Sequence, residues 1–492
     1  MKHLLLSFIY ISSVIYTHAQ APQLFLGEKI EDYNAGTFQL FSQDSLSLYS
    51  FRHVKQDYFI DVYDKATLKR SSVIKVPLPS GGTIKYNIEN LFISKDLFQI
   101  FYSYFDKSAG SENLEMISFD PGGVQSGGTK IIDQSEGQNE RQAGSFSVIN
   151  RKKFNEFLSY GYRRSKDGSS INIDHFDYTG NKLRSQDFVL DKSGFVVHSW
   201  LDDDCNLYHL TRNKMGNRNV NWAVKFYSPD RDQAMVIELK QPSMEKIYLS
   251  NFFKTYTDKQ HHINLLSTYS STPAARAAEG IYIARINLIS HTLQGESAIP
   301  FKLTNQNKNS EDAFSLSSSI LKTIIPISDN KTRVVFESRL ETTSTVYGIS
   351  VEREYDIGNI ATVDIDSNNT VTEMHNIQKQ QHTRSSDYKY TGFAILNHGN
   401  KSYFLYNELP GNLGRSPDKM KKVNSSKIDE TAIIYTEIDG DKVQRNILVN
   451  KDADGIDALL PGTYLPSPYK DEVYALRKIK NDVYLVKIFI NE

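Results

Sequence analysis

Eight times along this chain, a strand with alternating apolar residues is followed by a polar connection and a second such strand. The second strand ends on Asp or a related residue, just before a tight turn. Alternation with a period of two, bounded by Asp, Asn, Gly and Lys, predicts antiparallel strands joined by hairpins. The second strands with their turns read YFIDVYDKATL, NLEMISFDPGGV, INIDHFDYTGNKL, WAVKFYSPDRDQA, IYIARINLISHTL, IATVDIDSNNTV, IIYTEIDGDKV and VYLVKIFINE.

The repeats recur at spacings of 51 to 77 residues, aligned on Asp64, Asp120, Asp177, Ser228, Asn287, Asp364, Glu437 and Asn491. Units of this length are typical of four-stranded blades, so the chain resembles an all-β fold, a β-propeller of about eight blades. Seven blades are an alternative division, and a string of two or three β-sandwiches would also produce short strands with regular turns. The signatures of particular propeller families are absent, so the resemblance is to propellers in general.

The eighth repeat stops after its third strand, VYLVKIFINE. The segment QLFLGEKIEDY, residues 23–33, has the composition of a strand and lies near the other end of the chain. We expect this segment to pair with the last strand as the outer strand of the eighth blade. The pairing would close the ring and leave no exposed edge at the junction.

Residues 1–19 have the pattern of a secretory signal peptide. Lys2 is the positive residue, residues 4–16 form an apolar run, and residues 17–19 provide a cleavage site with a small final residue. We therefore expect residues 20–492 to form one exported propeller domain, periplasmic or extracellular, with no membrane-spanning segment. The 57 Lys and Arg residues nearly balance the 58 Asp and Glu residues, so a nucleic-acid partner is not expected.

Five connections in the second half of the chain are longer than a hairpin requires. We expect insert loops at 271–278, 302–312, 341–356, 378–388 and 410–428. In an up-and-down blade, connections between the second and third strands and connections between blades leave on the same face. The inserts should therefore gather over one sector of the ring, where long loops are often functional. Insertion drift on a tolerant surface is the alternative explanation.

The inserts carry Arg and Tyr, which are enriched among residues that dominate binding energy at protein interfaces. We predict that this lobe binds a protein or a glycan. The residues predicted to form the binding surface are Arg339, Tyr347, Arg353, Tyr355, Arg384, Tyr388 and Arg415.

One segment resembles the beginning of a calcium loop. NKDADGID places oxygen-bearing side chains at alternating positions around a glycine, and a hard cation needs several converging oxygens. The candidate ligands are Asn450, Asp452, Asp454 and Asp457. The pattern is incomplete, because Pro461 stands where a bidentate Glu is needed, and an ordinary Asp-Gly turn explains the same residues. No other cofactor is expected.

Local signatures of catalysis are missing from the sequence. No Gly-x-Ser-x-Gly nucleophile motif and no phosphate-binding loop occurs. The favoured interpretation is a binding or scaffold module of the cell envelope or the extracellular space. The alternative is a carbohydrate-active propeller, a glycoside hydrolase or lyase, whose carboxylates would come from separate blades around the axial funnel.

Overall fold

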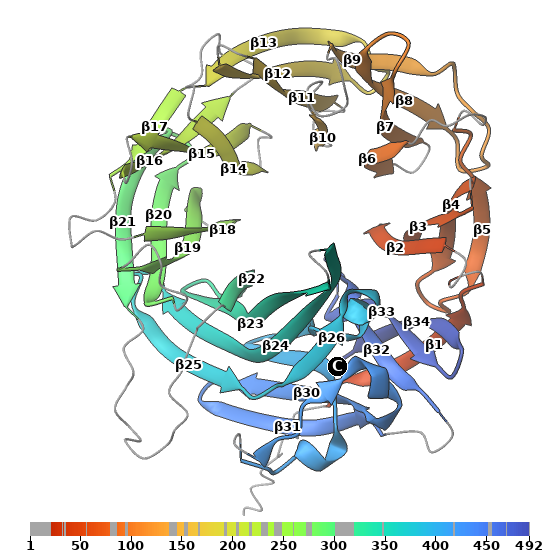
Figure 1. The fold of residues 1–492 in the computed structure, drawn as a ribbon, viewed down its shortest axis with the longest axis vertical. Helices are drawn as coiled ribbons and strands as arrows, with labels where there is room; N and C mark the ends of the chain where they lie inside the picture. Colours follow the sequence, from red (N-terminus) through yellow and green to blue (C-terminus); the bar gives the residue numbers. More distant parts are fainter. Residues whose placement is uncertain are drawn as a thin grey trace, which may run out of the picture.

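The described part of the chain forms eight sheets that follow one another around a central opening (Figure 1). This arrangement is an eight-bladed β-propeller, as the repeats predict. The structure is a computed structural model, and it describes residues 21–31, 33, 36–55, 57–78, 86–93, 97–136, 145–151, 156–165, 168–190, 194–202, 206–215, 219–227, 235–240, 248–258, 260–271, 278–300, 319–346, 349–416, 419–450, 455–468 and 470–491. The predicted signal peptide and the predicted insert at 302–312 lie outside these residues, as does most of the insert at 271–278.

Each blade contributes four strands that follow one another outward from the opening, and the first strand of the chain belongs to blade 8. Blades 1 to 4 comprise β2 (Gly36–Gln43), β3 (Ser47–Val54), β4 (Asp57–Asp64) and β5 (Arg70–Lys75); β6 (Asn87–Ile93), β7 (Phe98–Asp106), β8 (Ser111–Phe119) and β9 (Lys130–Glu136); β10 (Ser145–Arg151), β11 (Glu156–Ser165), β12 (Gly168–Asp177) and β13 (Lys182–Leu190); β14 (Gly194–Leu201), β15 (Leu207–Met215), β16 (Asn219–Tyr227) and β17 (Met235–Leu239).

Blades 5 to 8 comprise β18 (Tyr248–Thr257), β19 (His262–Ser270), β20 (Gly280–Asn287) and β21 (Thr292–Pro300); β22 (Ser319–Ser328), β23 (Lys331–Val346), β24 (Ile349–Asp366) and β25 (Val371–Ile377); β27 (Ala394–His398), β28 (Lys401–Glu408), β30 (Ala432–Asp439) and β31 (Lys442–Val449); β32 (Asp457–Pro466), β33 (Glu472–Ile479), β34 (Asp482–Phe489) and β1 (Gln23–Lys29). The connections of blades 6 and 7 contain β26 (Gln381–Arg384), β29 (Val423–Asn424) and the 3-10 helices η3 (Ser385–Tyr390), η4 (Pro410–Asn412) and η6 (Ser425–Glu430).

The two repeated strands of the sequence are the two middle strands of each blade, and the aligned Asp holds the following turn. The carboxylate of Asp64, for example, accepts the backbone N–H of Thr67 at 2.8 Å. In blades 6 and 7 the sequence alignment is displaced by two residues, because Asp366 and Asp439, rather than Asp364 and Glu437, end the third strand. A shift of two keeps every side chain on the same face of the strand, so alternation alone cannot detect it.

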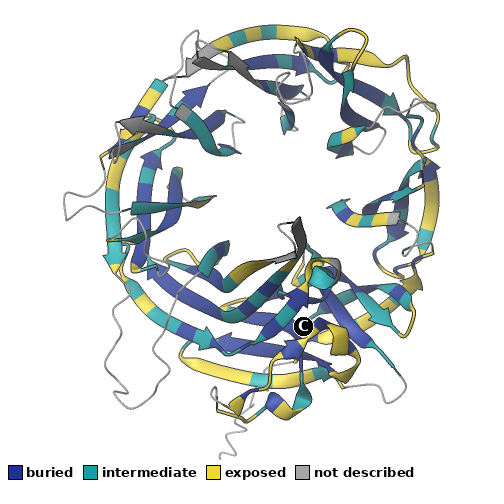
Figure 2. Ribbon diagram, in the orientation of Figure 1, coloured by how far each residue is buried: buried dark blue, intermediate teal, exposed yellow. Residues whose placement is uncertain are grey.

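A hydrophobic cluster lies between each pair of neighbouring blades in the described chain. Between blades 4 and 5, for example, Trp200, Tyr208, Trp222 and Phe253 pack together. The middle strands are mostly buried, whereas the outer strands alternate with exposed residues (Figure 2). Because burying one large apolar side chain contributes on the order of 2 kcal/mol, contacts between blades dominate the stability of the ring.

The predicted closure of the ring is confirmed. Strand β1 pairs antiparallel with β34, with Leu24 opposite Ile488 and Leu26 opposite Val486. Gly27 is required here, because a Cβ atom at this position would lie 2.3 Å from the Cβ of Leu68 in blade 1. The first strand therefore completes blade 8 and at the same time packs closely against blade 1.

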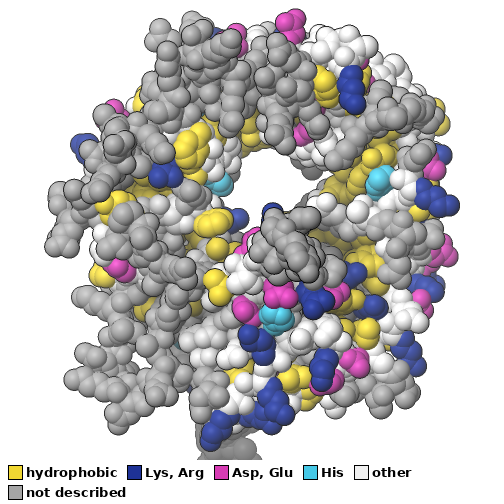
Figure 3. All heavy atoms as spheres, in the orientation of Figure 1, with side chains coloured by type: hydrophobic (Ala, Val, Ile, Leu, Met, Phe, Trp, Pro, Cys, Tyr) yellow, Lys and Arg dark blue, Asp and Glu magenta, His cyan; other side chains and the backbone are white. Residues whose placement is uncertain are grey.

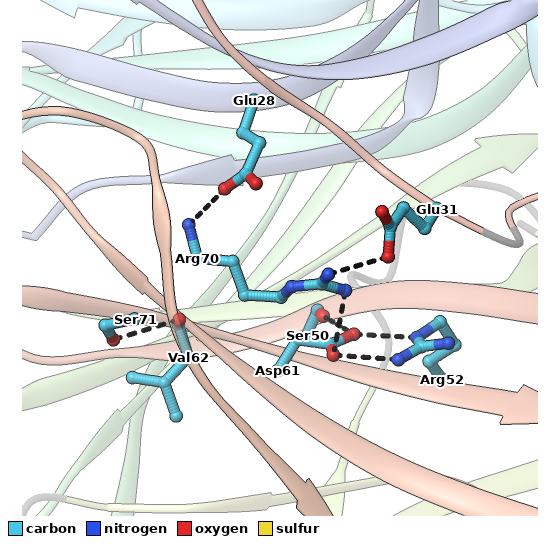
Figure 4. A network of polar contacts seen from close by, with 8 residues as sticks. All are labelled: Glu28, Glu31, Ser50, Arg52, Asp61, Val62, Arg70 and Ser71. Atoms are coloured by element: carbon cyan, nitrogen blue, oxygen red, sulfur yellow. Dashed lines mark hydrogen bonds and ion pairs between the residues drawn. The ribbon is translucent and has the colours of Figure 1, made fainter.

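A polar network also ties the first strand to blade 1 (Figure 4). Arg52 donates two hydrogen bonds to the carboxylate of Asp61, at 2.9 and 3.0 Å, and this carboxylate is completely buried. Arg70 lies 3.7 Å from the same carboxylate and donates to Glu31 at 2.9 Å. The backbone N–H of Arg70 donates to the carboxylate of Glu28 at 2.6 Å. Two acidic residues of the closing segment are thereby held by one arginine of the neighbouring blade.

Substitution of Asp61 by Asn should destabilise the propeller. The change preserves the shape of the side chain but removes the negative charge to which the guanidinium of Arg52, only 6% exposed, donates two hydrogen bonds. Removing one member of a buried ion pair typically costs about 3 kcal/mol, and urea unfolding would measure the loss. Asp482→Asn is the matched control, since its partner Lys29 lies 2.8 Å away but both side chains are about half exposed. Equal unfolding midpoints for the two variants would contradict the structural role assigned to Asp61.

The expected insert loop at 341–356 is instead regular structure. Strands β23 and β24 continue past the blade as a long hairpin, in which Leu340 pairs with Asp356 and Thr343 with Arg353. Pairing between the two strands satisfies the backbone groups that face each other, and β26 pairs with the outer side of β24. The inserts at 378–388 and 410–428 contain short helices and strands that pack beside this hairpin.

Candidate functional site

Three inserts join into one structure, called the cap here, which comprises residues 339–357, 381–390 and 410–430. Strand β26 pairs antiparallel with the extension of β24, with Glu354 opposite Arg384. Strand β29 then pairs in parallel with β26, with Gln381 opposite Val423. The sheet of blade 6 is thereby widened to six strands along β22, β23, β24, β26 and β29, with β25 beside β24. Connections from two blades thus form a single ordered surface.

Three of the predicted binding residues meet at the base of the cap. The guanidinium of Arg339 lies 4.6 Å from the ring centre of Tyr355 and 5.1 Å from that of Tyr388. The two rings contact each other edge to face at 5.1 Å. A cation over aromatic faces is a stabilising contact that keeps Arg339 extended between two segments of the cap. Its side chain remains 29% exposed and so is accessible to a partner.

The other predicted binding residues lie at the surface of the cap. Arg353 is 3.5 Å from Glu341, and Arg384 is 3.9 Å from Glu354, with more than half of each arginine side chain exposed. Arg415 is exposed after η4. Tyr347 lies outside the described residues. The structure therefore brings together Arg339, Tyr355 and Tyr388 and leaves the remaining arginines spread around them.

Two buried asparagines attach the cap to the blades, and sequence reasoning missed both. Asn407 of β28 donates to the backbone carbonyls of Tyr390 and Leu459, at 2.9 and 2.7 Å, and accepts the N–H of Leu459 at 2.9 Å. Asn412 of η4 donates to Glu408 at 2.7 Å and exchanges two hydrogen bonds with the backbone of Lys421. Neither residue stands in a recognisable motif, because each acts on segments that only the fold brings near.

A fully buried ion pair lies beneath the cap. The ammonium of Lys379 is 2.7 Å from one carboxylate oxygen of Glu337, and Lys322 is 3.0 Å from the other. Lys379 also donates to Gln381 of β26 at 3.0 Å. Burial by itself would raise the pKa of Glu337. The two ammonium groups outweigh burial and hold this pKa below its ordinary value. The sequence contained a signal here, because Glu337 lies within the apolar strand RVVFESRL of a blade covered on both faces.

Substitution of Glu337 by Gln should destabilise the protein in a pH-dependent way. Because the folded pKa is depressed, Glu337 contributes its stability above the ordinary value of 4.5, and this contribution is lost as the pH falls further. At neutral pH the loss should be about 3 kcal/mol, because Lys379 is left buried without its partner. Melting temperatures recorded from neutral pH to acid would show the variant approaching the wild type below the ordinary pKa.

Glu430→Gln is the control for this experiment, since Glu430 forms an exposed ion pair with Lys427 at 3.3 Å. Its difference from the wild type should be small at every pH. A constant deficit of Glu337→Gln across the pH range would contradict the role of the charge.

Asp364, Glu373 and His375 of blade 6 each offer a potential metal ligand, and these atoms lie within 4.8 Å of one another. Both carboxylates already have cationic partners. Arg333 donates to Asp364 at 2.7 and 2.8 Å, and Lys331 lies 2.7 Å from Glu373 and 3.1 Å from Asp364. These residues form a network of ion pairs that links the strands of blade 6.

The predicted calcium ligands are only partly described. Asp457 is buried, and its two carboxylate oxygens accept from Arg477 at 2.6 and 2.5 Å. Asn450 is exposed, whereas Asp452 and Asp454 lie outside the described residues. The calcium site stays a prediction, and the arginine already satisfies one of its four proposed ligands.

None of the helices in the described ranges is long and apolar enough to cross a membrane. No protein-family model matches the sequence, and no curated protein matches it. Among solved structures, the WD40 domain of SCAP from fission yeast has 9% identity and a TM-score of 0.39, over 96% of this chain and 98% of that one. The β-propeller domain of the Trilobed protease from Pyrococcus furiosus has 10% identity and a TM-score of 0.37, over 85% and 97%.

A prolyl endopeptidase has 11% identity and a TM-score of 0.36, over 83% of this chain and 55% of that one. The chain thus spans about half the length of that enzyme. Such similarities assign no activity to this chain. The protein is an eight-bladed β-propeller with a cap over blades 6 to 8.

Proposed function

We propose that this protein is a binding or scaffold module that recognises a protein or a glycan through the cap. The observation that carries the proposal is the joining of three separate inserts into one sheet-supported surface. Independent insertions on a tolerant surface would have no reason to pair with one another. Here β26 and β29 extend the sheet of blade 6 across the connection into blade 7. Recognition sites are commonly such loops held by a rigid scaffold.

The composition of the cap supports recognition by contact rather than catalysis. Arg and Tyr combine a large contact area with directional hydrogen bonds, and the Arg339, Tyr355 and Tyr388 cluster has both. Its members hold one another in place, so little conformational entropy would be lost on binding.

The proposed setting is the periplasm or the extracellular space. Support comes from residues 1–19, whose charged start, apolar run and small-residue ending match an export signal. The near balance of acidic and basic residues gives no reason to expect a nucleic-acid partner.

Trimming the hairpin of β23 and β24 should abolish partner binding without unfolding the propeller. Replacing residues 344–352 by Asn-Gly joins the paired residues Thr343 and Arg353 through a two-residue turn that suits a hairpin. The trimmed and wild-type proteins would be used as bait in envelope extracts and culture fluid. We expect a partner retained only by the wild type, with melting temperatures that agree within a few degrees.

Lys107→Ala is the control. Lys107 lies in the turn between β7 and β8 of blade 2, which corresponds to the connection between β23 and β24 and so lies on the same face of the ring. This variant should capture the partner as the wild type does. Retention of the same partner by the trimmed protein would show that the hairpin is not the recognition surface.

A further inference from the structure

Two lysines, one from the cap and one from blade 8, lie against the same tyrosine ring at the edge of the cap. The ammonium of Lys389, in η3, is 5.5 Å from the ring centre of Tyr390. The ammonium of Lys478, in β33 of blade 8, is 5.8 Å from the same ring centre. Lys389 also lies 5.5 Å from the ring centre of Tyr33, which follows the closing strand. The site therefore forms only where the cap, blade 8 and the closing segment meet.

Neither lysine forms an ion pair in the described chain, although other lysines nearby do. Lys422 is 2.7 Å from Asp356, and Lys379 is 2.7 Å from Glu337. Asp387 is the acidic group that acts on Lys389, and its effect is smaller than that of Lys478. Burial and the positive charge of Lys478 together lower the pKa of Lys389. Two half-buried positive charges thus lie against one tyrosine ring, and Asp387 is the opposing charge with the smaller effect.

Such an arrangement is unfavourable in the free protein, because like charges repel and partial burial weakens their hydration. The tyrosine rings offset only part of this energy through cation–π contacts. A bound oxyanion between the ammonium groups would remove the repulsion and form charge-assisted hydrogen bonds, which are among the stronger polar contacts. The site is therefore better suited to a liganded state than to the free one.

We propose that Lys389 and Lys478 bind the carboxylate of an acidic protein segment that docks on the cap. This inference rests on the proposed function and specifies the chemistry of the partner. Arg415, Lys419 and Lys421 are also exposed on the cap, and their side chains form no ion pair in the described chain. In Figure 3, Lys and Arg side chains lie over the lower part of the face, on the side of blades 6 to 8, among Asp and Glu side chains.

An acidic protein segment fits this surface for two reasons. Several carboxylates spaced along an extended backbone could engage cations at separate positions, as acidic motifs do on basic clusters. On the same cap, the partly exposed Arg339 and Tyr388, which pack with the buried Tyr355, offer guanidinium and aromatic groups typical of contacts between proteins. One surface then provides both charge steering and a centre for apolar contact.

The test uses a fluorescein-labelled octaglutamate peptide and fluorescence anisotropy with the full protein at low salt. We expect binding to the wild type that weakens as salt screens the charges. The double variant K389A/K478A should bind at least about tenfold more weakly, since it lacks both ammonium groups. Octaglutamate should also raise the melting temperature of the wild type but not that of the double variant.

The matched control is K107A/K442A, which removes two exposed lysines outside the cap and so changes the net charge equally. It should bind octaglutamate as the wild type does. The double variant K389A/K478A should melt no lower than the wild type, because it removes a repulsion rather than an attraction.

Three results would overturn the inference: no octaglutamate binding to the wild type, equal binding by K389A/K478A, or an equal loss in the control. Tighter binding of polygalacturonate through the same two lysines would also overturn it and assign the site to an acidic glycan. Capture of the native partner by the two variants distinguishes failure of this inference from failure of the proposed function. Capture that survives K389A/K478A but fails with the trimmed hairpin would refute the lysine site alone, whereas capture by the trimmed protein would refute the role of the hairpin in recognition.

Discussion

The rest of the structure depends on the pairing of β1 with β34, which joins the two ends of the ring. Each blade of a propeller is stable only while both of its faces are covered, and blade 8 meets blade 1 through the cluster that contains Leu48, Leu68, Leu476 and Leu485. Gly27 permits the close approach at that junction, and Arg70 holds the closing segment by Glu28 and Glu31. Without this closure, blades 1 and 8 would each expose an apolar face.

The closed ring also positions the cap. Asn407 binds the backbone of η3 and of β32, so blade 7, blade 8 and the cap are connected through one buried side chain. Lys379 and Glu337 fix the point at which the chain leaves blade 6 for the cap. These groups are polar and buried, and each has partners from other segments. Such networks favour a single arrangement, because partial satisfaction of a buried polar group is costly.

The fold could be predicted in detail because its signals are local. Strands next to each other in a blade are next to each other in the chain, and alternation identifies both their existence and their faces. The alignment of the repeats was nevertheless displaced by two residues at Asp364 and Glu437, because a shift of two preserves the alternation. It also treated 341–356 as a loop, because Thr-rich polar strands such as ETTSTV lack the apolar face by which a strand is recognised. Arg339, Tyr355 and Tyr388 were identified by residue type, but their stacking depends on the register of the hairpin.

The sequence by itself determined the number of repeats, the ring, its closure by the first strand and the face on which the three described inserts of blades 6 and 7 lie. All of these follow from short-range periodicity and from the need to cover strand edges. Only the tertiary structure decided that the inserts form one cap, that Glu337 and Lys379 meet beneath it, and that Lys389 and Lys478 share a tyrosine ring. These contacts join residues from different blades, and their geometry is fixed by how the blades pack around the ring. No spacing along the chain encodes that geometry.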